Sequence, residues 1–101
     1  MYLRITDDGR LILEEIDDFT RFHIAAAPER LEGEGASRDF RHIAEAAEEG
    51  HFWIDADAIV ALSPKAGDED WTSAFRAMLE KAEPYGFADL QGRRIKAHVA
   101  D

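Results

Sequence analysis

The sequence contains no cysteine. This absence excludes disulfide bonds, thiolate catalysis and zinc sites that use cysteine ligands. The sequence also lacks a glycine-rich phosphate-binding loop, a serine nucleophile elbow and a pair of histidines spaced for zinc binding on a helix. We therefore expect neither a cofactor nor a bound metal, and the lack of catalytic motifs favours a protein that acts by binding.

Long apolar runs are also missing. No run approaches the roughly 20 apolar residues that a membrane-spanning helix needs. The first ten residues lack the basic region and the apolar core of a signal peptide. We therefore expect a soluble, cytoplasmic protein that does not insert into a membrane.

Positive charge is scarce, because 12 lysines and arginines face 22 aspartates and glutamates, for a net charge of −10. A field of this sign repels phosphate groups, so we expect no direct contact with nucleic acid or with an anionic membrane surface. High solubility, adaptation to salt, and mimicry of nucleic acid by an inhibitor would each account for the acidity. The sequence alone does not choose between them.

The length and composition suit one folded domain, residues 1–101, because 46% of the residues are hydrophobic. Alternation of apolar and polar residues predicts strands, and an Asp-Gly pair at Asp8 and Gly9 predicts the turn of a hairpin. The predicted strands cover residues 2–6, 10–14, 19–26, 51–55 and 93–99.

Helical spacing predicts three helices. The clearest covers residues 68–82, where an apolar stripe follows an acidic start and precedes Pro84. A second covers residues 37–49 with Ser37 as its cap, and a short third runs from Asp55 or Asp57 to Leu62. The fold class predicted from these elements is α+β. It is a small mixed or antiparallel sheet of about five strands with two or three helices on one face, a two-layer sandwich.

Four residues are candidates for a polar site on the sheet: His23, His51, Asp55 and His98. Alternation places them on the polar sides of their strands. Imidazole beside carboxylate can perform general acid–base catalysis near neutral pH, and two histidines with a carboxylate can hold a divalent metal. A polar strand face that only contacts water is the commoner arrangement, and strand order decides between these alternatives.

Trp53 is a candidate interface residue, because alternation places it opposite Phe52 and Ile54. An indole on an open sheet face is expected to pack against other residues, either of this chain or of a second subunit. Arg94 and Lys96 belong to the one basic patch, which could face acidic residues across a twofold axis.

Our leading hypothesis is therefore a small acidic domain that acts by binding, first to a second copy of itself as a homodimer and second to another protein. The alternative is a small enzyme or a small-molecule-binding protein with a His/Asp pocket on the sheet face. Convergence of three of the four polar candidates around a concavity would favour that alternative.

Overall fold

A computed structural model describes residues 1–100 and confirms the α+β class. It contains one seven-stranded mixed sheet with the order β2-β1-β3-β7-β5-β4, and β6 pairs separately with β7. The strands are β1 (Tyr2–Ile5), β2 (Leu11–Glu14), β3 (His23–Ala25), β4 (Ala44–Ala46), β5 (His51–Asp55), β6 (Ala88–Asp89) and β7 (Arg94–Ala100).

Strand β7 organises the sheet. It runs antiparallel to β5 along one edge. Along its other edge it pairs first with β6 and then, further along, with the parallel strand β3. The edge of β7 is therefore shared by two short strands, β6 and β3.

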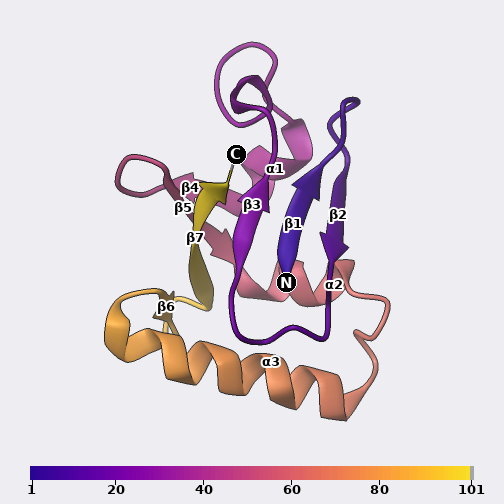
Figure 1. Cartoon of the computed structure of the whole chain (residues 1–101), viewed down its shortest axis with the longest axis vertical. Coiled ribbons are helices and arrows are strands. Elements are labelled where there is room, and N and C mark those ends of the chain that lie inside the picture. The colour runs from indigo at the N-terminus through magenta and orange to yellow at the C-terminus, as the bar shows by residue number, and fades with distance from the viewer. Residues whose placement is uncertain (101) are drawn as a thin grey trace.

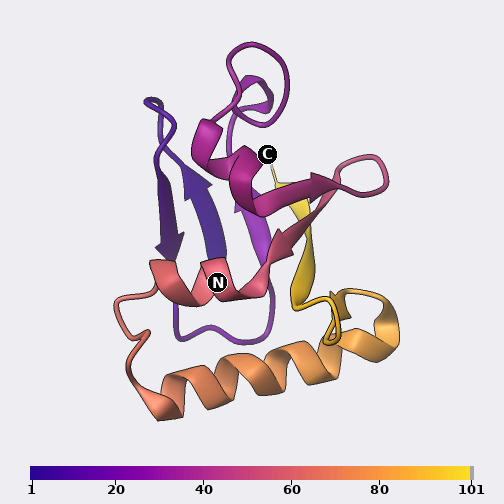
Figure 2. The same cartoon turned by 180° about the vertical axis from the view of Figure 1, so that it is seen from behind.

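Three helices enclose the core: α1 (Arg38–Ile43), α2 (Ala56–Leu62) and α3 (Glu69–Ala82). Helices α1 and α2 cover one face of the sheet, while α3 lies across the lower end of the strands (Figures 1 and 2). Fully buried side chains between these layers include Leu3, Ile24, Phe40, Ile54 and Ile59. The opposite face of the sheet, which we call the open face, has no helix in front of it (Figure 1).

Helix α3 confirms the strongest helical prediction. The Asp68 carboxylate caps it by accepting hydrogen bonds from the backbone N–H groups of Asp70 (2.9 Å) and Trp71 (3.3 Å). The Trp71 indole N–H donates to the carbonyl of Ile16 at 2.8 Å, which ties the helix to the connection before β3. After the helix, Gly86 adopts the left-handed conformation, with φ of +83°.

The predicted helix over residues 37–49 is wrong in its second half. Ser37 is the cap, and its hydroxyl accepts a hydrogen bond from Phe40 N–H at 3.2 Å. The helix nevertheless ends at Ile43, and the next three residues form β4, which pairs with β5. Gly50, with φ of +79°, lies in the turn of this hairpin instead of closing a helix. Pairing with β5 therefore overrides the helical propensity of the alanines.

The strand predicted over residues 19–26 is shorter in the structure, because only His23–Ala25 pair with other strands. The hairpin of β1 and β2 is confirmed, with Leu3 opposite Leu13 and Ile5 opposite Leu11. Among the described residues, no helix has both the length and the hydrophobicity to cross a bilayer.

Candidate functional site

Polar and aromatic side chains cross the open face in one row. The strand register places Glu14 beside Tyr2, Tyr2 beside His23, His23 beside His98, and His98 beside His51. The rings of Tyr2 and His23 stack with their centroids 4.9 Å apart. The centroids of His23 and His98 are 5.8 Å apart, and those of His98 and His51 are 6.4 Å apart. Three of the four polar candidates are therefore neighbours, and we call this the histidine row.

The three imidazoles of the histidine row lie side by side on the open face. No hydrogen bond among the described residues joins two of its imidazoles, and His51 Nδ1 lies 3.2 Å from the Glu49 carbonyl oxygen. The pKa of His23 is lowered, first because burial disfavours the charged ring and then because His98 is close. Within residues 1–100, no three histidine, aspartate or glutamate side chains are arranged to hold a metal ion.

Asp55, the fourth candidate, lies apart from the row. Its carboxylate caps α2 by accepting hydrogen bonds from the backbone N–H groups of Asp57 (2.9 Å) and Ala58 (3.3 Å). A carboxylate engaged in this way serves the start of the helix. Three of the four candidates are therefore neighbours, but the pockets found in the described residues do not hold them together, since His98 lines one pocket and Asp55 lines another.

Trp53 is also on the open face, and its cover comes from the neighbouring strand. The guanidinium carbon of Arg94 lies 4.3 Å from the centre of the indole, and Lys96 Nζ lies 4.9 Å from it. Lys96 Nζ also contacts a Glu48 carboxylate oxygen at 2.7 Å. The indole is thus half-buried between two cations, an arrangement that its π-face favours.

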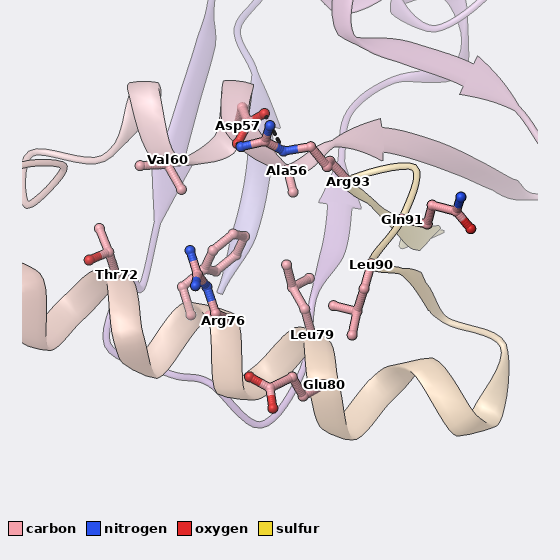
Figure 3. A pocket seen from close by; sticks show the side chains of 11 residues that line it. Ala56, Asp57, Val60, Thr72, Arg76, Leu79, Glu80, Leu90, Gln91 and Arg93 are labelled. Atoms are coloured by element: carbon pink, nitrogen blue, oxygen red, sulfur yellow. Dashed lines mark hydrogen bonds and ion pairs between the residues drawn. The ribbon is translucent and has the colours of Figure 1, made fainter.

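A groove of about 590 Å³ separates α2 from α3 (Figure 3). Its floor is apolar, with Phe75 and Leu79 from α3 and Val60 from α2. Its rim carries the ion pair between Arg93 and Asp57, whose closest N–O distance is 3.1 Å. Arg76 and Glu80 complete the rim, so its two acidic and two basic groups balance.

A second hollow, of about 480 Å³, lies at the junction along the edge of β7 where β6 ends and β3 begins. We call it the edge pocket. Its wall includes Phe19, Phe22, Met78, Phe87 and Ile95, which come from separate parts of the chain. Sequence analysis missed this pocket, and the only available signal was the group of phenylalanines outside regular elements.

No family model, curated protein or solved structure matches the chain.

Proposed function

We propose that this chain acts by binding protein, as a cytoplasmic homodimer in which the open faces of two copies meet. The observation that carries the proposal is the open face itself, which no helix of this chain covers and which carries the half-buried Trp53 and the histidine row. Aromatic side chains of this kind are enriched at protein interfaces, where they contribute contact area and polar edges together.

The charges of the open face support contact between two identical surfaces. Arg4 lies 3.4 Å from Glu14, and Lys96 lies beside Glu48, so positive and negative groups alternate across the face. In a twofold interface each patch meets a copy of the same surface, and alternating charges allow cations to face acids. Repulsion from the net charge of −10 is screened beyond about 8 Å at physiological salt.

The sheet edges offer a weaker route to association. The two outer strands are short, with four residues in β2 and three in β4, and each carries a glutamate. Short, charged edge strands disfavour edge-to-edge pairing. The open face is therefore the better candidate for the dimer contact.

A His/Asp pocket receives less support. A general base must be within hydrogen-bond distance of its partner, and no hydrogen bond among the described residues joins two imidazoles of the histidine row or joins one of them to a carboxylate. Asp55 is engaged at the start of α2. A row of histidines without a hydrogen-bonded carboxylate partner fits a contact surface better than a catalytic site.

Sedimentation equilibrium in physiological salt tests the proposal. We expect the wild-type chain to dimerise at tens of micromolar, and Trp53→Ala to weaken the dimer by about tenfold or more because it removes the largest aromatic side chain of the open face. Tyr85→Ala is the matched control, since Tyr85 is 80% exposed on the turn after α3 and outside the sheet. Circular dichroism checks that both variants remain folded.

A wild-type chain that stays monomeric at tens of micromolar would contradict the proposal. A dimer that Trp53→Ala leaves unchanged would also contradict it, because association would then use another surface. Equal weakening by Trp53→Ala and Tyr85→Ala would point to a general loss of stability and not to a contact on the open face.

A further inference from the structure

The edge pocket combines an apolar wall with a cationic rim. Phe87 is 47% exposed, so the pocket presents apolar surface to solvent. Its volume of about 480 Å³ lies within the range of small-molecule sites, which is roughly 300–1,000 Å³. The wall includes residues from the connection before β3, from α3 and from β7. Phe22, Met78 and Ile95 of these segments are buried in the hydrophobic core.

The charge of the rim is opposite to that of the whole chain. The cations Arg21, Lys81 and Lys96 line the pocket together with His98, and no aspartate or glutamate does. Yet 22 of the chain's 101 residues are acidic. The groove between α2 and α3 lacks this bias, because its acidic and basic groups balance.

Of these three cations, Lys81 and Arg21 are exposed at the rim of the pocket. Lys81 is exposed on the last turn of α3, and none of the ion pairs among the described residues includes it. The side chain of Arg21 is 73% exposed, with Asp18 at 3.5 Å. Lys96 is different, because Glu48 and Trp53 hold its amino group and leave its aliphatic stem to line the pocket.

We propose that the edge pocket binds a small organic acid, namely a carboxylate on an aliphatic or aromatic body. The body packs against Phe87 and Met78, where it removes exposed apolar surface from water. The carboxylate lies at the rim near Lys81 and Arg21, whose N–H groups donate charge-assisted hydrogen bonds to it. This ligand class uses both halves of the pocket, whereas an inorganic anion would leave the apolar wall in water.

Octanoate is the probe for a test by amide chemical shifts in NMR titrations. We expect saturable shifts at residues 19–22, 78–87 and 95–98. Octylammonium has the same chain with the opposite charge, and acetate has the charge without the chain. Because binding needs both parts, each should bind at least about tenfold more weakly than octanoate.

Variants separate the two halves of the pocket. Lys81→Gln should weaken octanoate binding about three- to tenfold by removing one charge–charge contact. Phe87→Ala should weaken it by a similar factor by removing apolar contact. Arg38→Gln is the matched control for charge, because Arg38 begins α1, lines no part of the edge pocket and should leave the affinity unchanged.

Three outcomes would overturn the inference. They are the absence of saturable shifts, equal binding of octylammonium and octanoate, and equal effects of Lys81→Gln and Arg38→Gln. The inference does not depend on the homodimer, although Lys96 and His98 belong to both surfaces. Repeating the titration with Trp53→Ala keeps the two questions separate, since sedimentation reports association and the amide shifts report the ligand.

Discussion

Replacement of Phe75 by alanine tests how α3 is attached to the rest of the fold. Phe75 is 2% exposed, and its ring stacks on Trp71 with centroids 5.4 Å apart and planes 5° from parallel. Trp71 in turn is held by its hydrogen bond to the carbonyl of Ile16. Loss of the phenyl ring therefore removes core contacts and the support of the neighbouring indole at once.

The expected loss of unfolding free energy is about 3–5 kcal/mol, the usual range for a buried phenylalanine cut back to alanine. The stacked pair adds about 0.5–1.5 kcal/mol beyond burial alone, which favours the upper part of that range. A domain of this size has roughly 5–15 kcal/mol of stability in total. The variant should therefore be close to its folding limit but still measurable.

Urea denaturation followed by circular dichroism gives the value directly. With a slope of about 1.5 kcal/mol per molar urea, a loss of about 4 kcal/mol lowers the midpoint by roughly 2–3 M. Arg76→Ala is the control on the same helix, since Arg76 is exposed and should change stability by less than about 0.5 kcal/mol. A loss below about 1 kcal/mol for Phe75→Ala would refute the assignment of this ring to the core.

Two further predictions concern acid and metals. The pKa of Asp18 is lowered to about 2, chiefly because its carboxylate accepts hydrogen bonds from the hydroxyl and backbone N–H of Thr20. Because folding lowers this pKa, the stabilisation is complete above about pH 4 and is lost as the pH falls toward about 2. Asp18→Asn should therefore flatten the decline of the unfolding free energy measured between these pH values. An unchanged decline would contradict this prediction. Calorimetric titration of tag-free protein with zinc and nickel should show weak binding or none, whereas one-to-one, sub-micromolar binding that His51→Ala abolishes would favour a metal site.

The sequence was most informative where the structural signals were local. Helix α3 has its cap at Asp68, its apolar stripe and its stop at Pro84 within one continuous segment. The hairpin of β1 and β2 likewise needs only alternation and the turn at Gly9, whose φ is +87°. Each of these elements can be predicted without knowing what it packs against.

Prediction failed where a distant strand decides the local structure. The propensities of residues 44–46 favour a helix, but these residues lie beside β5 and pair with it as an antiparallel strand. Strand β6 is two residues long and exists only because β7 offers an edge. The edge pocket follows from the same cause, since it occupies the junction between β6 and β3 on that edge.

In the candidate site, the face on which a side chain lies and its position along the strand have to be predicted separately. Alternation with a period of two predicts which face a side chain occupies, and it placed the three histidines and Asp55 together on the polar side. Which residues are neighbours along the strands depends on the register, which pairs His98 with both His23 and His51. Asp55 is four residues beyond His51 on the same strand, and at about 3.3 Å per residue it is roughly 13 Å from the row. The three histidines are therefore neighbours because β3, β7 and β5 are adjacent and in register. Asp55 has the same face but a different position along β5, so its carboxylate does not lie beside them.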